Sequence, residues 1–287
     1  MARDKRQAQP VDAPVLRNPE LEEALQLAID GDSKLLLRFL LQATNLRGQP
    51  PSPAFGRAFA DAVAAFGREA DDLVEELLAL PESALGGEKS QAHMQALVAH
   101  VLGGRVLVAR RARPEWAILM QLAEDYRKPV RDGVVAALTR VALEGPAGVD
   151  GLLQELAGWT DGFLQACVAL EVLSQKSVLS HLSLEGTFPE RLEECIVLAV
   201  DAPRSAARSQ GRRTLVMVLG QVLPMLVQRF PDLLPQLVPH VPSKDPTVQE
   251  MWSTIRQGMD KLGLPGVDLD ALGGAAEGKT QRRGGRR

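Results

Sequence analysis

The feature that most constrains this chain is a two-helix unit that recurs along it. The unit is clearest at residues 114–125 and 130–138, where two stretches with apolar residues at helical spacing are separated by a short break. Units start again at intervals of roughly 35 to 42 residues, the period of helical-pair repeats. A single unit leaves an apolar face uncovered, so neighbouring units must stack to bury it. The pattern predicts an all-α, right-handed α-solenoid of about six to seven stacked helix pairs.

The composition agrees with helices packed through aliphatic side chains. Hydrophobic residues make up 45% of the 287 residues and aromatic residues only 4%. Leucine and alanine favour helices, whereas β-sandwiches are rich in β-branched and aromatic residues. The two cysteines, Cys167 and Cys195, lie in apolar stretches without a close-spaced partner, so we expect buried free thiols.

Proline, glycine and charge divide the chain into three parts. Residues 1–17 predict a flexible N-terminal arm, and residues 18–263 predict the solenoid, with weak repeats over 18–113 and clearer ones over 114–263. Residues 264–287 predict a disordered basic tail. The net charge of −3 includes about +2 from residues 1–17 and +4 from residues 273–287, which leaves a body near −9.

Helix pairs are predicted on both sides of one uncertain segment. The segment at 90–113 contains Gly103 and Gly104, which could end its helix or lie within it, so its partner stays open. The predicted pairs beyond it are 114–125 with 129–143, 149–159 with 162–173, 189–200 with 204–227, and 231–240 with 246–262.

Two turns give the chain a likeness to a known repeat family. The run Asp245-Pro246-Thr247-Val248-Gln249 and the segment from Asp125 to Val130-Arg131 resemble the Asp-Pro-x-Val-Arg turn of HEAT repeats. The first turn has Gln249 where the pattern has arginine, and the second contains extra residues. The resemblance implies an armadillo-type fold with a ladder of polar contacts along the stack, which would pair Asp125 with Arg131 and, more loosely, Asp201 with Arg208.

A group of arginines is the sharpest basic feature of the body. Arg204, Arg208 and Arg212 recur at every fourth residue, so on one helix they would form a stripe, with Arg213 one position round. We predict that they bind a partner together with Arg131, which would line the surface or support it. The alternative is a solvated face with intramolecular ion pairs.

No sequence signature of catalysis is found. The chain has no Walker loop, no dinucleotide-binding glycine motif behind a strand, and no zinc-protease motif. His93 and His100 could share a helix face, but they lack further ligands at metal spacing. We therefore predict a non-enzymatic protein without cofactor or metal site.

These observations predict a scaffold or adaptor that binds a protein partner along its concave surface. The alternative is a nucleic-acid-binding HEAT-like protein, similar to the DNA alkylation repair glycosylases, and the basic stripe or tail would allow weak contact with nucleic acid. The acidic body disfavours it. No apolar leader follows the basic N-terminus and no run is long enough to span a bilayer, so a cytoplasmic protein without membrane contact is expected.

Overall fold

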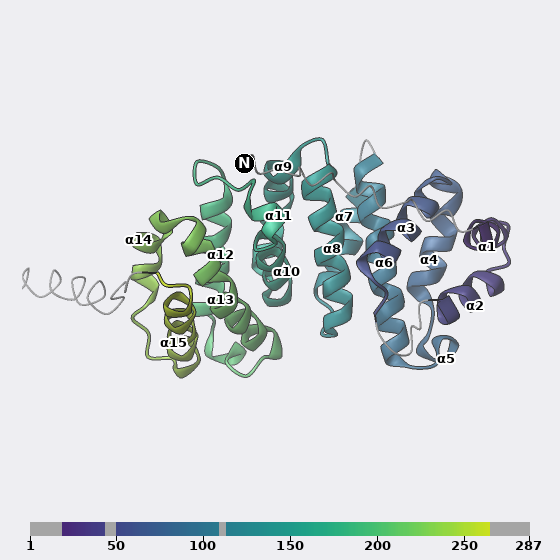
Figure 1. Cartoon of the computed structure of the whole chain (residues 1–287). Coiled ribbons are helices and arrows are strands. Elements are labelled where there is room, and N and C mark those ends of the chain that lie inside the picture. The colour runs from purple at the N-terminus through teal and green to yellow at the C-terminus, as the bar shows by residue number, and fades with distance from the viewer. Residues whose placement is uncertain (1–18, 44–49, 109–112, 265–287) are drawn as a thin grey trace, which may run out of the picture.

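A computed structural model describes residues 19–43, 50–108 and 113–264 (Figure 1). Every regular element in these ranges is a helix, which confirms the all-α class. The predicted arm at 1–17 lies outside the described residues, as does the predicted tail apart from Leu264. Leu264 packs against the core, so the folded part reaches at least to this residue.

Fifteen α-helices and five short 3-10 helices make up the described residues. The first seven α-helices are α1 (Pro19–Ile29), α2 (Lys34–Ala43), α3 (Pro53–Ala64), α4 (Asp71–Ala79), α5 (Glu82–Leu85), α6 (Glu88–Val108) and α7 (Arg113–Ala123). The others are α8 (Lys128–Glu144), α9 (Gly148–Glu155), α10 (Phe163–Leu173), α11 (Lys176–Leu179), α12 (Phe188–Val200), α13 (Gln210–Arg229), α14 (Leu234–Leu237) and α15 (Pro246–Lys261). The 3-10 helices are η1 (Gly67–Ala70), η2 (Leu156–Asp161), η3 (Arg204–Ala206), η4 (Pro231–Leu233) and η5 (Val238–His240).

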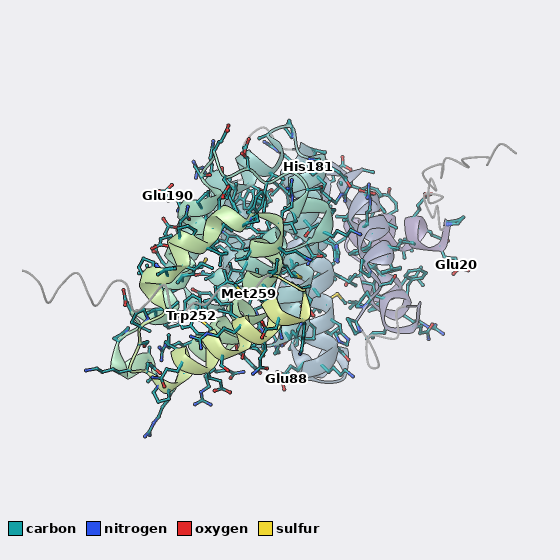
Figure 2. All side chains as sticks on the ribbon, turned by 60° about the vertical axis from the view of Figure 1, so that its left-hand side comes forward. Glu20, Glu88, His181, Glu190, Trp252 and Met259 are labelled. Carbon is teal, nitrogen blue, oxygen red and sulfur yellow. The ribbon has the colours of Figure 1, made fainter. Side chains whose placement is uncertain are left out.

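The longer helices form a row that follows the chain. Helix α3 packs on α6, α6 on α8, α8 on α10, α10 on α13, and α13 on α15. Figure 1 shows α1 and α2 at one end of an elongated molecule and α14 and α15 at the other. Figure 2 brings the α15 end forward, with Trp252 and Met259 on α15 and Glu20 at the far end. One apolar core runs through the row from Leu21 to Met259.

Polar caps and prolines fix where several helices begin. The Ser52 hydroxyl accepts a hydrogen bond from the Phe55 amide at 3.2 Å, and Pro53 opens α3. The Asp245 carboxylate accepts one from the Thr247 amide at 2.8 Å, and Pro246 opens α15. Both arrangements satisfy an amide that has no partner within its helix, and in both a proline occupies the first helical position, where no N–H donor is needed.

Gly103 and Gly104 lie within α6, which settles the segment that the sequence left open. Their role is close packing against neighbouring helices. A Cβ atom at Gly103 would lie 2.8 Å from the Ala137 Cβ on α8, and one at Gly133 on α8 would lie 2.6 Å from the Ala96 Cα on α6. The two helices therefore meet through glycine and alanine at two places.

Three predicted helices differ from the structure. The one expected at 149–159 ends as an α-helix at Glu155 and continues as the 3-10 helix η2. The helix expected at 204–227 begins only at Gln210, after a separate 3-10 turn, because Ser209 caps it. The helix expected at 231–240 is divided into η4, α14 and η5. Pro235 and Pro239 lie in this stretch and cannot donate a backbone hydrogen bond, which disfavours a continuous α-helix.

The tryptophans and cysteines lie in the interior or against it, as expected for the cysteines. Trp159 and Trp252 are buried, and Trp116 is half-buried with its ring edge against Trp159 at a centroid distance of 6.4 Å. Cys167 and Cys195 are buried free thiols. Within the described ranges, no helix combines the length and the apolar character that crossing a lipid bilayer requires.

Candidate functional site

The predicted arginine stripe does not form in the structure. Arg204 belongs to η3, Arg208 lies before α13, and only Arg212 and Arg213 are on α13. The Ser209 hydroxyl accepts a hydrogen bond from the Arg212 amide at 3.2 Å, which starts the helix after Arg208. The prediction of one helical stripe is therefore wrong, because the fourfold spacing is interrupted by this cap. The Arg204 side chain lies outside the described part of the chain.

Arg212 is one of the most buried side chains, with 1% of its surface exposed. Its Nε donates to the Ala199 carbonyl at the end of α12 at 3.0 Å, and its Nη2 donates to the Asp245 carboxylate at 2.8 Å. Asp245 caps α15, so this guanidinium joins α12, α13 and α15. In this position Arg212 stabilises the fold and does not face solvent.

The electrostatics of Asp245 agree with a structural ion pair. Partial burial alone would raise the pKa of this carboxyl, but hydrogen bonds from Arg212 and the Thr247 amide outweigh it and hold the pKa below its ordinary value. The carboxylate is therefore ionised at neutral pH and pairs with Arg212.

Replacing Arg212 with leucine is expected to lower the free energy of unfolding by about 2 kcal/mol. The change leaves the buried Ala199 carbonyl without its donor, whereas Asp245 is 32% exposed and can be hydrated. Urea denaturation followed by circular dichroism measures the loss. Arg208→Leu is the control, because this exposed side chain should change stability by less than about 0.5 kcal/mol. Equal effects of the two variants would contradict the assigned role of Arg212.

Arg131 is also buried and makes a different contact from the one that the HEAT resemblance implies. Its Nη1 donates to the Asp125 backbone carbonyl at 2.7 Å. The Asp125 carboxylate instead pairs with Arg127, whose Nε lies 2.9 Å from Oδ1. Arg127 also donates to the side-chain oxygens of Gln91 and Gln95 on α6. Sequence reasoning missed Arg127, although its place two residues after Asp125 could have indicated a turn contact.

The four predicted site arginines whose side chains the structure describes fall into two groups. Arg131 and Arg212 hold turns together from inside the fold, and Arg208 and Arg213 remain exposed. The Arg213 Nη2 donates to the Arg208 carbonyl at 2.9 Å, so these two neighbours share a local contact. The structure does not gather these residues into one basic surface.

A different surface emerges where α8, α10, α13 and α15 meet. One pocket of about 340 Å³ lies between α13 and α15. A second, of about 360 Å³, lies between α8, α10 and α13. Gln221 lines both pockets, so the two hollows adjoin at this residue of α13. We call this surface the groove, and its lining residues are Lys128, Asp132, Val135, Glu171, Ser174, Gln175, Arg213, Val216, Met217, Val218, Gln221, Val222, Met225, Thr247, Glu250, Met251 and Thr254.

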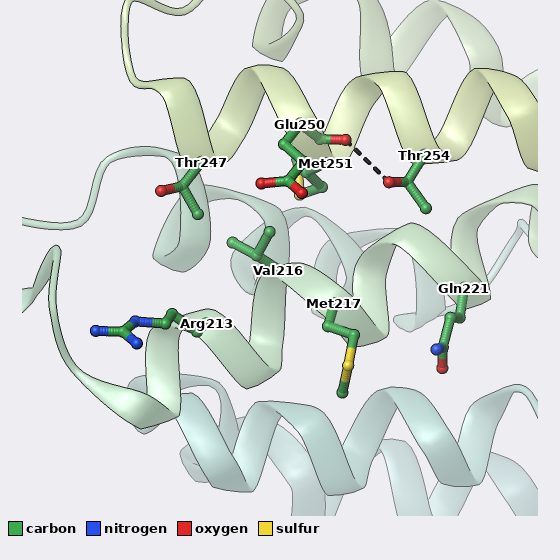
Figure 3. Close-up of a pocket in the computed structure, with 8 residues that line it drawn as sticks. All are labelled: Arg213, Val216, Met217, Gln221, Thr247, Glu250, Met251 and Thr254. Atoms are coloured by element: carbon green, nitrogen blue, oxygen red, sulfur yellow. Dashed lines mark hydrogen bonds between the residues drawn. The ribbon is translucent and has the colours of Figure 1, made fainter.

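Helix α13 supplies the middle of the groove through one face. Arg213, Met217, Gln221 and Met225 follow each other at every fourth position and therefore lie along one side of the helix. Met217 is 54% exposed and Met225 37% exposed. Figure 3 shows Arg213, Met217 and Gln221 on α13, opposite Thr247, Glu250 and Thr254 of α15, with Val216 and Met251 in between. The groove thus offers flexible apolar side chains beside polar ones.

The charged groups of the groove partly neutralise each other. Lys128 and Asp132 form an ion pair along α8. Glu171 is half-buried between this pair and α13, and its carboxylate makes no hydrogen bond or ion pair with any described residue. Burial raises the pKa of Glu171 and Asp132 adds to the shift, whereas the cations Lys128 and Arg131 oppose it. Glu171 is therefore a partly desolvated carboxylate without a hydrogen-bonding partner.

A separate hollow lies near Trp116, at the turn between α8 and α9. It measures about 340 Å³ and is lined by Val106, Leu107, Trp116, Val141 and the 145–148 turn, among others. The half-exposed Trp116 ring is held against Trp159. This hollow does not continue into the groove, because the two share no lining residue.

The two histidines considered as metal ligands, His93 and His100, both belong to α6. His93 is fully buried, and the His100 ring packs against Gly56 of α3. Among the described residues, no group of three or more His, Cys, Asp or Glu side chains could hold a metal ion.

Comparison of the chain with protein-family models, curated proteins and solved structures gives no significant match. No relative therefore assigns a role to any residue of the groove.

Proposed function

We propose that this chain is a non-enzymatic helical-repeat scaffold that binds a segment of a protein partner along the groove. The observation that carries the proposal is that two pockets along four successive helices adjoin at Gln221. The exposed Met217 lines one pocket and the exposed Met225 lines the other. Isolated exposed apolar residues are ordinary, but exposed methionines within a groove suit an adaptable binding surface.

The same proposal includes the finer architecture. The stepwise packing from α6 to α15 supports a right-handed α-solenoid of the HEAT or armadillo type. The contacts of Arg131 with the Asp125 carbonyl and of Arg212 with Asp245 support it further, since they join successive elements near the turns. In such a stack the groove-forming helices would be the second members of their pairs and would face inward.

Nothing in the described structure favours the nucleic-acid alternative. Its main support was the arginine stripe, and Arg212 is buried in an ion pair with Asp245. The ionisable residues of the groove are two cations and three carboxylates, namely Lys128, Arg213, Asp132, Glu171 and Glu250. A phosphate backbone requires an excess of cations.

Changing Met225 to glutamate is expected to reduce partner recovery at least tenfold in a tagged pull-down from lysate of the source cells. The charge would have to be desolvated where a partner packs on the groove. Met120→Glu is the matched control, because Met120 on α7 is also 37% exposed and does not line the groove. Each pull-down is run with and without nuclease, and bound material is identified by mass spectrometry and nucleic-acid staining.

Two results would contradict the proposed function. If the two variants recovered equal amounts of partner, the partner would not bind in the groove. Recovery of nucleic acid that nuclease abolishes would instead support the alternative class of protein. Substitutions at Arg212 are unsuitable for this experiment, because loss of binding could follow from loss of the fold.

A further inference from the structure

The charges that remain unpaired in the groove indicate which kind of partner segment could bind there. Lys128 and Asp132 cancel each other across an ion pair, which leaves one cation, Arg213, against two carboxylates. Glu171 and Glu250 line the groove without an ion pair to any described residue. The groove therefore carries a small excess of negative charge, with Glu171 the more buried of its two unpaired carboxylates.

The position of Glu171 makes it a suitable anchor. It lies on α10, in the same pocket as Met225 and Gln221 of α13. A carboxylate that has lost part of its hydration gains more from a cationic hydrogen-bond donor than an exposed one does. Burial already raises the pKa of this carboxyl, which a bound cation would reverse.

The apolar part of the groove lies beside this carboxylate, on the neighbouring helix α13. Met225 lines the Glu171 pocket, Met217 lines the neighbouring one, and Gln221 lies between them. Buried Val218 and Val222 form the floor beneath. Unbranched methionine side chains adjust to apolar groups of different shapes, so the groove can accept leucine-like side chains in more than one register.

From this juxtaposition we propose that the groove binds a basic amphipathic peptide segment. Its apolar side chains pack on Met217 and Met225, and one lysine or arginine donates to the Glu171 carboxylate. The inference rests on the proposed function and adds the chemical class of the partner segment.

Fluorescence anisotropy with two synthetic peptides tests the proposal on the full-length chain. One labelled peptide carries leucine and lysine in an amphipathic helical pattern, and the other has glutamate in place of every lysine. We expect the leucine–lysine peptide to bind and the leucine–glutamate peptide to bind at least tenfold more weakly. The Glu171→Gln variant should bind the leucine–lysine peptide about tenfold more weakly, the effect of losing one charge-assisted hydrogen bond.

A matched variant separates the anchor from general attraction to an acidic protein. Glu185→Gln removes the same charge from an exposed position between α11 and α12, outside the groove, and should change affinity less than twofold. A double Met217→Ala and Met225→Ala variant should also weaken binding at least tenfold. Circular dichroism confirms that each variant remains folded before its affinity is compared.

Four outcomes would overturn the inference. Equal affinity for the two peptides would exclude recognition of a basic segment. Equal effects of Glu171→Gln and Glu185→Gln would leave Glu171 without a special role. If a peptide of the chain's own residues 265–287 displaced the probe, the groove would bind this segment and not a partner protein. If the pull-down depends on Met225 while the leucine–lysine peptide fails to bind, the proposed function stands and the inference on partner chemistry fails.

Discussion

Replacing Gly133 with valine is expected to lower the free energy of unfolding by about 3 kcal/mol, at the upper end of the range for overpacked cores. A Cβ atom at this position would lie 2.6 Å from the Ala96 Cα and 2.7 Å from the Ala96 carbonyl oxygen. These are backbone atoms of α6, so they cannot rotate away as the tip of a side chain would. Helices α6 and α8 must separate, which exposes part of the core between them. Urea denaturation followed by circular dichroism measures the effect.

Gly158→Val is the matched control for this substitution. Gly158 is exposed in η2, and a Cβ atom there would meet nothing within 4 Å. We expect a change below about 1 kcal/mol, which covers the altered backbone preference of an exposed residue. If Gly133→Val were as stable as Gly158→Val, α6 and α8 could not pack as closely at Gly133 as the structure has them.

The positions of most helices could be predicted because their signals are local. Apolar spacing marks each buried face, and Pro114 and Pro246 lie near the start of a helix. The close contact of Gly133 with Ala96 could not be predicted in the same way. It depends on which helix packs on which, and a glycine within a helical pattern is locally only a weak point.

The candidate site was harder to predict than the fold. The arginine stripe rested on spacing within an assumed helix, and the Ser209 cap divides that segment. Arg212 could not be recognised as buried because its partners, Ala199 and Asp245, belong to other elements. The groove was missed because Met217 and Met225 lie in an apolar stretch that predicts core. Their common spacing with Arg213 and Gln221 is the signal that could have indicated an exposed face.

A second large effect is expected from pH, through His100. Burial first, and then the nearby Arg140 guanidinium, lower the pKa of this histidine to about 4 from its ordinary 6.5. The His100 ring lies where α3 meets α6, so close to Gly56 that a Cβ there would be 2.5 Å from the His100 Cδ2. Arg140 is held by Asp61 on α3 and by Glu144 at the end of its own helix, α8. The ring is therefore neutral in the folded protein at neutral pH.

The sign of the pH effect follows from which state binds the proton. Below pH 6.5 the unfolded chain protonates this histidine, while the folded chain resists protonation until pH approaches 4. The stabilisation due to neutral His100 is complete above 6.5 and is lost as pH falls toward 4. Between pH 7.5 and pH 4.5 the protein should lose about 2.5 kcal/mol through this group alone.

Urea denaturation at the two pH values, on wild type and His100→Gln, isolates this contribution from the carboxylates that titrate in both. The glutamine variant is expected to be less stable at pH 7.5, because the packing changes, but to lose about 2.5 kcal/mol less than wild type on acidification. His181→Gln replaces an exposed histidine and should retain the wild-type pH dependence, since His100 is still present. If His100→Gln lost stability as steeply as wild type, His100 would be protonated in the folded state. Its ring could then not be buried beside Arg140 where α3 meets α6.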